Sequence, residues 1–342
     1  MPVLTVDLLS SSKNWALPPS GAQAIRDRTP ADWTVHFVES PTVSDGDGGA
    51  PPSAELLQKI ADAEVYFGFG MPEPLFRAAP RLRWVQSAAA GVASLLHAPM
   101  LASDVLLTNA AGLMAEPIAD HVAGGVLYFL RGFDLAMARY RDGVWDKAPF
   151  IEGELLREAS ECHAVVVGAG GIGSAIAQRL SAHGMRVTGV RRRVQAERPD
   201  GFAAMATLGE LDGLLPTADV IVLAAAHTPE TRGLLTAARL AALPRRAILA
   251  NVARGALVDE AALAAALRAG ALRGAVLDVF SQEPLPPGHA LWGLPNVLFT
   301  PHISAISPRR FWERQLALFF DNWDRYCHGA PLRNVVDKRA GY

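Results

Sequence analysis

The chain of 342 residues is 50% hydrophobic and 19% charged, which is enough for buried cores and for more than one domain. The formal net charge is −2, with acids and bases interspersed, which argues against the extended positive surface that nucleic acids require. The two cysteines, Cys162 and Cys327, lie far apart and lack metal-ligand spacing. We therefore expect no disulfide, no metal site and a reducing, cytoplasmic setting.

The N-terminal segment MPVLTVDLL carries a short apolar run that contains Asp7, with no positively charged region before it. This pattern predicts a buried strand and not a signal peptide. No uninterrupted apolar stretch reaches the roughly 20 residues that a membrane-spanning helix needs. We accordingly expect a soluble chain with no membrane partner.

Short apolar runs alternate with helical or turn-rich segments over the first 109 residues, as in a layered α/β domain. A helix is predicted at 54–62. The predicted strands are 3–9, 33–38, 65–69, 83–86 and 105–109. We place the end of this first domain near Asn109.

The apolar segment 115–131 has helical periodicity and two glycines, so we predict a helix that is buried, either within the chain or against a second subunit. Apolar runs of strand length then alternate with helical segments, and this alternation predicts a second doubly wound parallel sheet. Its helices are predicted at 171–183 and 259–269, and its strands at 163–167, 185–190, 219–224, 246–250, 273–277 and 297–299. A last helix, within 307–328, is predicted to return to the first domain.

The segment AVVVGAGGIGSAIAQRL places Gly168, Gly170 and Gly173 in G-x-G-x-x-G register between a strand and a helix. Here the first glycine allows a tight turn, the second lets the backbone approach a pyrophosphate, and the third lets the helix lie close to the strand. The helix N-terminus adds free N–H groups and a positive dipole end. We predict a dinucleotide site; the alternative is a glycine-rich turn without a ligand.

The strand in MRVTGVRRR ends in Arg191, where dinucleotide folds usually carry an acid for the adenosine ribose 2′-hydroxyl. Arg192 and Arg193 follow, and guanidinium groups suit capture of a 2′-phosphate, with no carboxylate there to repel it. We therefore expect NADP to be preferred, with NAD as the second cofactor. The alternative is a solvated basic turn that touches no ligand.

Three ionisable residues follow predicted strands, where an open α/β sheet presents its ligands: Arg254 in NVARGALVDE, Glu283 in DVFSQEPLP and His302 in FTPHISA. Each one alone has an ordinary structural explanation. Together they supply a carboxylate clamp, an orienting carboxylate and an acid, which are the groups that reduction of a 2-oxo acid needs.

These segments resemble the D-isomer-specific 2-hydroxyacid dehydrogenase family, and the glyoxylate and hydroxypyruvate reductases in particular. The resemblance runs over nearly the whole chain. It is carried by QSAAAGVASL at 86–95, TNAAGLMAEPIADHV, GAGGIG, HTPETRGLL, NVARGALVDE, VLDVFSQEPLP and LWGLPNVLFTPHISA.

The resemblance implies a Rossmann NAD(P)-binding domain, 110–304, inserted into a flavodoxin-like substrate domain made of 1–109 and 305–342. It also implies a homodimer built largely through the inserted domain. The implied reaction transfers a hydride between NADP(H) and a small 2-oxo or 2-hydroxy acid of the D-isomer.

By the same resemblance, His302 is the general acid and base, Glu283 holds its imidazole and favours the protonated form, and Arg254 binds the substrate carboxylate. The N–H groups of Ala89, Ala90 and Gly91 would take the other carboxylate oxygen. Asp278 is expected to contact the nicotinamide carboxamide; the alternative role is to cap a buried strand end. The expected cofactor contacts are Gly168, Gly170, Gly171, Ile172, Gly173, Arg191, Arg192, Arg193, His227, Thr228, Val252, Ala253, Arg254, Asp278, His302 and Ser304.

Two other functions stay open. The fold also serves in non-catalytic corepressors that sense a dinucleotide. Such a protein would not need Arg254, Glu283 and His302, which are all present here. An enzyme that acts on a larger acid, such as phosphoglycerate, is the other alternative. We do not favour it, because no regulatory domain of the usual kind follows before Tyr342.

Overall fold

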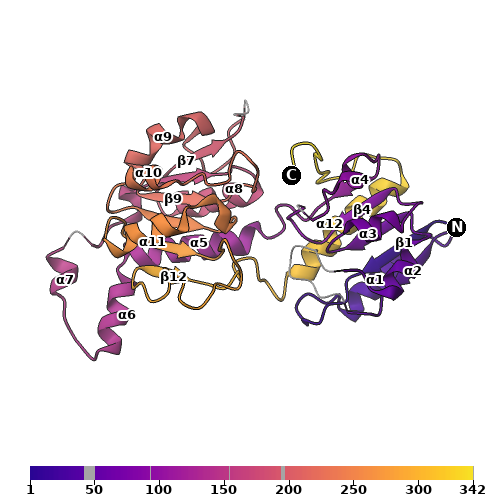
Figure 1. Cartoon of the computed structure of the whole chain (residues 1–342), viewed down its shortest axis with the longest axis horizontal. Coiled ribbons are helices and arrows are strands. Elements are labelled where there is room, and N and C mark those ends of the chain that lie inside the picture. The colour runs from indigo at the N-terminus through magenta and orange to yellow at the C-terminus, as the bar shows by residue number, and fades with distance from the viewer. Residues whose placement is uncertain (42–50, 93, 154, 194–196, 342) are drawn as a thin grey trace. The chain divides into compact units, whose positions relative to one another are not determined.

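The computed structural model describes residues 1–41, 51–92, 94–153, 155–193 and 197–341, so Ala93 of the segment 86–95 lies outside the described residues. The chain forms two compact units (Figure 1). Unit 1 comprises Met1–Leu113 and Ser307–Tyr342, and unit 2 comprises Met114–Ile306. Unit 2 is thus an insertion within the chain of unit 1.

Unit 1 is built on a five-stranded parallel sheet in the order β2-β1-β3-β4-β5, the flavodoxin-like order. Every predicted strand of this domain is present, with ends that differ by one or two residues. The strands are β1 (Val3–Asp7), β2 (Thr34–Phe37), β3 (Val65–Gly68), β4 (Trp84–Ser87) and β5 (Leu106–Thr108).

Helices cover both faces of this sheet because its side chains alternate between two apolar layers. Tyr66 packs toward α2 (Ala54–Ile60), α3 (Glu73–Arg77) and α4 (Ala98–Leu101). Phe67 points the other way and stacks on Phe319 of α12 (Phe311–Cys327), with ring centroids 4.3 Å apart. Against α12 lies α1 (Pro19–Arg28), which the sequence did not predict.

Unit 2 carries a seven-stranded parallel sheet in the order β12-β11-β10-β9-β6-β7-β8. The order reverses between β6 and β9, as in a Rossmann fold. The strands are β6 (His163–Val167), β7 (Arg186–Arg191), β8 (Ala204–Thr207), β9 (Val220–Leu223), β10 (Ile248–Asn251), β11 (Gly274–Leu277) and β12 (Val297–Phe299). Strand β8 was missed, because its sequence AMAT is short and only partly buried.

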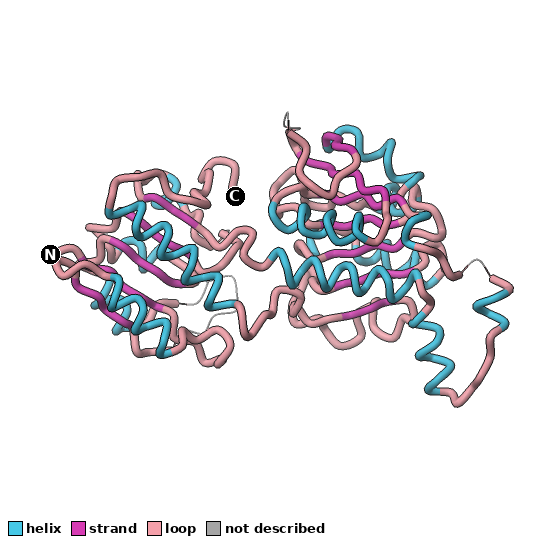
Figure 2. The backbone as a smooth tube through the Cα atoms, turned by 180° about the vertical axis from the view of Figure 1, so that it is seen from behind, coloured by secondary structure: helices cyan, strands magenta, loops and turns pink. Residues whose placement is uncertain are grey.

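Two helical layers enclose this sheet. One layer holds α9 (Leu211–Leu214), α10 (Ala237–Ala241) and α11 (Glu260–Arg268), and the other, seen in Figure 2, holds α5 (Ala115–Leu130) and α8 (Gly171–Ala182). Gly125 brings α5 close, since an added Cβ would lie 2.7 Å from Val276 of β11. The apolar helix after Ala115 is therefore buried within its own unit, and its apolar side chains do not need a second subunit to cover them.

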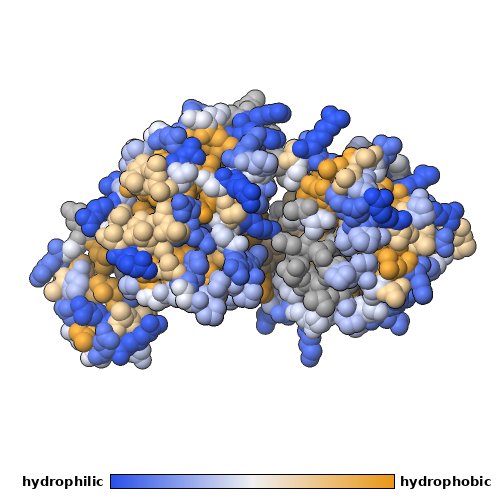
Figure 3. Space-filling view, viewed as in Figure 1, coloured by the Kyte–Doolittle hydropathy of each residue, from blue (hydrophilic) through white to orange (hydrophobic). Residues whose placement is uncertain are grey.

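Beyond α5 the chain forms an arm, 133–153, with α6 (Phe133–Arg141) and α7 (Ala148–Ile151). Its base is fixed by Arg273, whose two terminal nitrogens each lie 2.7 Å from a carboxylate oxygen of Asp134. Apolar atoms are visible on the arm in Figure 3. Its exposed apolar residues are Phe133, Met137, Tyr140, Val144, Trp145 and Ile151.

The remaining helical turns are the short 3₁₀ segments Ala159–Glu161, Leu208–Glu210, Leu215–Thr217 and Gly255–Leu257. Within the described ranges, the longest apolar helices are too short or too polar to cross a bilayer.

Candidate active site

The expected functional residues of unit 2 lie in loops that follow the carboxyl ends of neighbouring strands, the edge at which open α/β sheets bind ligands. His302 follows β12, Glu283 follows β11 and Arg254 follows β10. Further along the same edge come the loop after β9, the glycine loop after β6 and the arginines at the end of β7. The row spans six neighbouring strands, with the three ionisable residues at one end.

The glycine loop has the geometry that a pyrophosphate site needs. Gly168 adopts φ +101°, and its backbone lies so close to the loop after β9 that a Cβ would come within 2.5 Å of the Ala224 carbonyl carbon. A Cβ on Gly173 would overlap the carbonyl oxygen of Gly168. By contrast, the described atoms leave open space beside Gly170, where a ligand would approach the start of α8. Gly171 and Ile172 open that helix.

Arg191 ends β7 and is half-buried, while Arg192 and Arg193 are exposed. The expectation that no carboxylate lies near these arginines is wrong. The loop after β9 brings Glu230 to the arginines, and its Oε2 lies 3.8 Å from Nη1 of Arg192. Glu230 is 38 residues from Arg192 in the sequence, so only the crossing of β9 next to β6 brings the two charges together.

Two polar side chains shape the loops between the glycines and the reactive residues. Thr231 accepts the N–H of Thr228 at 2.8 Å and donates to the carbonyl of Ala226 at 2.7 Å, which fixes the exposed His227 between them. Asn251, at the end of β10, accepts from Ala253 N–H at 3.1 Å and donates to the carbonyl of Arg254 at 3.0 Å. Neither Thr231 nor Asn251 was singled out from the sequence.

The loop after β10 is pressed against the loop after β11. A Cβ on Gly255 would overlap the backbone of Phe280 and Ser281, so glycine is required there. Val252 and Ala253 are buried, and the half-buried Arg254 donates from Nη1 to the carbonyl of Ala253 at 2.7 Å. Arg254 thus lies in the loop after β10, and β10 pairs with β11, whose following loop carries Glu283.

His302 and Glu283 form a direct pair. Nδ1 of the imidazole lies 2.7 Å from Oε2 of Glu283, and the other carboxylate oxygen accepts the N–H of Phe280 at 2.9 Å. The two side chains are 43% and 34% exposed, so the imidazole remains accessible. With Nδ1 engaged, Nε2 is the nitrogen left for a substrate.

Asp278 is fully buried at the end of β11, and its carboxylate organises the loop that carries His302. Oδ1 accepts the N–H of Ile303 at 2.8 Å, and Oδ2 accepts the N–H of Ser304 at 3.0 Å. Burial opposes ionisation, but these bonds and those from the Ser304 and Thr300 side chains hold the pKa of Asp278 below its usual value. Of the two roles expected for Asp278, the structure shows the capping role.

In unit 1 the loop after β4 offers two peptide N–H groups. The carbonyls of Ala88, Ala89 and Ala90 accept from Gln315 Nε2 at 2.6 Å, Ala110 N at 3.0 Å and Asn109 Nδ2 at 2.8 Å. In a planar trans peptide the C=O and the following N–H point in opposite directions. The N–H groups of Ala90 and Gly91 therefore point away from the body of unit 1, and within the described residues they donate to no other group.

Ala89 differs from its two neighbours in this loop. Its N–H donates to Ser87 Oγ at 3.1 Å and is already in use, so two of the three expected donors remain. Sequence reasoning missed Ser87, Asn109 and Gln315. Gln315 gave no signal in the sequence, because its burial within a helix rich in aromatic residues is known only from the structure.

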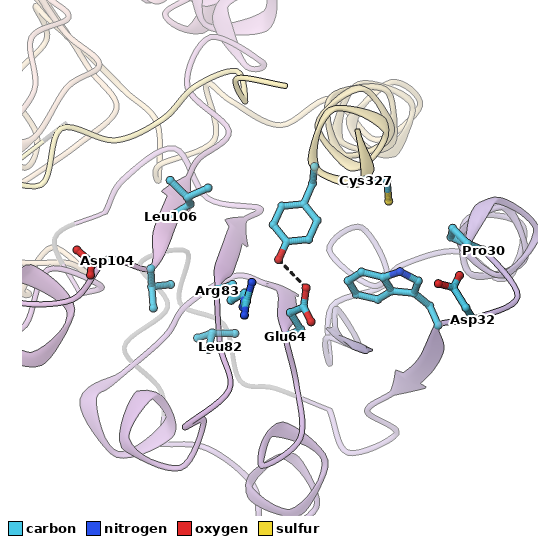
Figure 4. A pocket seen from close by; sticks show the side chains of 11 residues that line it. Pro30, Asp32, Glu64, Leu82, Arg83, Asp104, Leu106 and Cys327 are labelled. Carbon is cyan, nitrogen blue, oxygen red and sulfur yellow. Dashed lines mark hydrogen bonds between the residues drawn. The ribbon is translucent and has the colours of Figure 1, made fainter. Parts of the chain in front are cut away.

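Two hollows lie at the opposite, amino edges of the sheets. One, of about 830 Å³, is lined by Trp33, Glu64, Arg83 and Tyr326 of unit 1, and Figure 4 shows Glu64 and Arg83 among the side chains around it. The Tyr326 hydroxyl donates to Glu64 Oε1, 2.8 Å away. The other, of about 490 Å³, is lined in unit 2 by His163, Asp219 and Arg246 among others. Neither contains a predicted site residue. Over the described ranges, no group of three or more His, Cys, Asp or Glu side chains is arranged to hold a metal ion.

The sequence model described as "D-isomer specific 2-hydroxyacid dehydrogenase, NAD binding domain" matches residues 123–304 of the chain. Glyoxylate/hydroxypyruvate reductase B of Serratia proteamaculans is 32% identical over 318 residues, which cover 92% of this chain and 94% of that protein.

Two solved structures resemble the whole chain. A D-isomer specific 2-hydroxyacid dehydrogenase from Xanthobacter autotrophicus, in complex with NADPH and MES, is 32% identical with a TM-score of 0.80, over 100% of this chain and 99% of that one. An NADPH-dependent glyoxylate/hydroxypyruvate reductase from Sinorhizobium meliloti, in complex with NADP and sulfate, is 28% identical with a TM-score of 0.79, over 100% of both chains. The predicted fold class and family resemblance are confirmed. Since the family model covers more than half of the residues, the chain belongs to the D-isomer specific 2-hydroxyacid dehydrogenase family and is an NAD(P)-dependent oxidoreductase.

Proposed function

We propose that this protein reduces a short 2-oxo acid to the D-2-hydroxy acid with NADPH, glyoxylate and hydroxypyruvate being the first candidates. The observation that carries the proposal is the His302–Glu283 pair, 2.7 Å apart, at the carboxyl edge of a dinucleotide-type sheet. Reduction of a carbonyl needs a proton donor at the oxygen, and a carboxylate-supported imidazole is suited to that task. The names of the Serratia and Sinorhizobium relatives support the substrate class.

In this proposal Nε2 of His302 donates a proton to the carbonyl oxygen of the substrate and recovers one after product leaves. Glu283 keeps the ring oriented through Nδ1 and stabilises the imidazolium by its negative charge. Arg254 binds the substrate carboxylate, and the outward N–H groups of Ala90 and Gly91 are proposed to donate hydrogen bonds to that carboxylate as well. The cofactor, when bound, supplies the hydride that reaches the carbonyl carbon.

The residues of unit 2 fit a phosphorylated dinucleotide. Gly168, Gly170 and Gly173, with the N–H groups at the start of α8, are suited to the pyrophosphate. Arg191, Arg192 and Arg193 are suited to the 2′-phosphate, in keeping with the NADP and NADPH complexes of the two solved structures. Unit 2 would then be the cofactor domain and unit 1 the substrate domain. Two free cysteines, one of them buried, are compatible with a cytoplasmic location.

We also propose a homodimer, in which a second copy of the chain covers the arm 133–153. The indole of Trp145 is 91% exposed and Tyr140 is 78% exposed, which is costly for an isolated chain. The bidentate Arg273–Asp134 pair, with exposures of 14% and 11%, holds the base of the arm in place for such a contact. Light scattering after gel filtration should give twice the chain mass, and the double variant Y140S/W145S should shift the mass toward one chain.

The first experiment follows loss of reduced-nicotinamide absorbance, with NADPH and NADH in parallel, over glyoxylate, hydroxypyruvate, pyruvate, phenylpyruvate and branched 2-oxo acids. Turnover that is faster with NADPH and absent in H302A supports the proposal. Chiral analysis of the product should give the D-isomer. If no acid turns over while NADPH still binds, the oxidoreductase proposal for these substrates is wrong and a dinucleotide sensor is the better description.

A further inference from the structure

The backbone that carries His302 is held in an unusual conformation. His302 has φ +54°, in the left-handed region that non-glycine residues rarely adopt. Such a conformation persists only where the surroundings fix it. Here the His302 N–H donates to the carbonyl of Asp278 at 2.9 Å, and the next two N–H groups donate to the Asp278 carboxylate.

Thr300 adds a side-chain contact to the same carboxylate. Its hydroxyl oxygen lies 2.7 Å from Oδ1 of Asp278 and 3.2 Å from Nε2 of His121, which comes from α5. Asp278 has a lowered pKa and is ionised at neutral pH, so it can only accept hydrogen bonds. The single hydroxyl hydrogen of Thr300 must therefore point to Asp278.

The direction of the second bond follows from the first. Because the Thr300 hydrogen is used for Asp278, its oxygen is free only to accept, and the hydrogen between Thr300 and His121 must sit on Nε2 of His121. A directed chain results, in which His121 donates to Thr300 and Thr300 donates to Asp278. The chain joins a helix on the face of the sheet to the loop of the proposed acid.

We infer that His121 and Thr300 are positioning residues, which polarise and orient the Asp278 carboxylate so that it holds residues 302–304 in the conformation that presents His302 to Glu283. Neither residue is assigned to substrate or cofactor. The inference rests on the proposed function where it concerns turnover. The hydrogen-bonded arrangement itself does not depend on that function.

The segment that contains Asp278 and Phe280 also holds Glu283, the partner of His302. Asp278 holds the acid from one end of the three-residue segment 278–280, and the Phe280 N–H holds Glu283 from the other end, at 2.9 Å. A shift of Asp278 would therefore change the alignment of Nδ1 with Oε2. Misplacement of catalytic groups by about 1 Å can reduce rates by roughly 100-fold.

The test compares variants that remove a hydrogen bond with variants that keep it. T300V and H121L remove the hydroxyl and the donor with little change in volume, whereas T300S and H121Q retain them. We expect T300V and H121L to reduce kcat roughly 10- to 100-fold while Kd for NADPH, measured by fluorescence, and Tm stay near those of the native chain. T300S and H121Q should keep most of the turnover. T300V/H121L should be no worse than T300V, because both changes break one chain.

Amide hydrogen exchange provides a readout that needs no turnover. In T300V and H121L the amides of 302–304 should exchange faster, while those of β6, in the same unit, should not. Unchanged exchange at 302–304 together with kcat within twofold of the native chain would overturn the inference. So would losses in T300S and H121Q equal to those in T300V and H121L. If the native chain reduces no 2-oxo acid, the proposed function fails, and the exchange experiment alone decides the positioning role.

Discussion

Both oxygens of the Glu283 carboxylate are occupied, one by His302 Nδ1 at 2.7 Å and the other by the N–H of Phe280 at 2.9 Å. The carboxylate is therefore fixed before any substrate arrives, and it fixes the imidazole in turn. An ion pair between two unrestrained surface side chains is free to form and break and contributes little, whereas here the Phe280 N–H restrains the carboxylate.

The pair leads to a first prediction. H302A removes the proton donor and should reduce kcat by roughly 100- to 10,000-fold, the usual contribution of general acid catalysis. E283Q keeps the shape of the side chain but replaces the carboxylate with a neutral amide, which cannot stabilise the imidazolium, and should cost roughly 100-fold. Kd for NADPH should change less than twofold in both variants. Steady-state kinetics decide the matter, and near-native kcat in H302A would remove His302 as the acid.

The contact of Glu230 with Arg192 leads to a second prediction. If the arginines bind a 2′-phosphate, the nearby carboxylate opposes that binding, so E230Q should tighten NADPH and leave NADH nearly unchanged. R191Q/R192Q should weaken NADPH roughly 10- to 100-fold, the loss expected for charge-assisted hydrogen bonds, with a much smaller effect on NADH. Isothermal titration with both cofactors measures each ratio. Equal weakening of the two cofactors would contradict 2′-phosphate recognition.

A third prediction concerns the loop of unit 1. Gln315 donates to the Ala88 carbonyl at 2.6 Å, and its loss would release the first of the three restrained peptides. Q315L should raise KM for the 2-oxo acid roughly 10-fold, since a hydrogen bond of this kind is worth about 1 kcal/mol and loop order adds to it. KM for NADPH should not move. Q58L, at an exposed position of α2, is the matched control and should behave as the native chain; an effect of Q315L on NADPH alone would refute the assignment.

The fourth prediction is a pH dependence of stability that arises from Asp219, which is buried at the amino end of β9. Burial opposes its ionisation, but hydrogen bonds from Arg157, the His163 N–H and Arg246 outweigh that effect and lower its pKa. A lowered folded-state pKa stabilises the fold above the ordinary aspartate value of about 3.9, and that stability is lost as pH falls through the folded value.

Thermal unfolding therefore should show a decrease in Tm below about pH 4 that is smaller in D219N than in the native chain. At neutral pH, D219N should cost about 3 kcal/mol, because it leaves a partly buried Arg157 without its partner, 2.8 Å away. The D200N variant, at an exposed position, is a control for general charge effects. A native-like unfolding free energy for D219N would contradict the central role of this carboxylate.

The elements that the sequence predicted well are those whose signal is local. Buried parallel strands are continuous apolar runs, and the glycines of 168–173 are required by contacts within one turn, so neither depends on distant parts of the chain. Strand β8 gave no such signal. Its four residues become a strand through pairing with β7, and only part of that short strand is buried.

The features that sequence reasoning missed are contacts between residues far apart in the chain. Glu230 meets Arg192, and Gln315 meets Ala88 across 227 residues, because the strand order places their loops or helices side by side. The use of the Ala89 N–H by Ser87 was also beyond prediction, since loop conformation decides which of three similar N–H groups remains available.

The loop of Ala88 to Gly91 offers only peptide groups, because its side chains are no larger than a methyl. Recognition of this kind is insensitive to the chemical identity of the residues that perform it, provided that the backbone keeps its course. The residues whose N–H groups bind the substrate would then tolerate substitution, while the residues that hold their backbone would not. Substitutions at the exposed Ala90 should be largely silent, whereas substitutions at Asn109 and Gln315 should be harmful, although these two residues contact the loop only through its carbonyl oxygens.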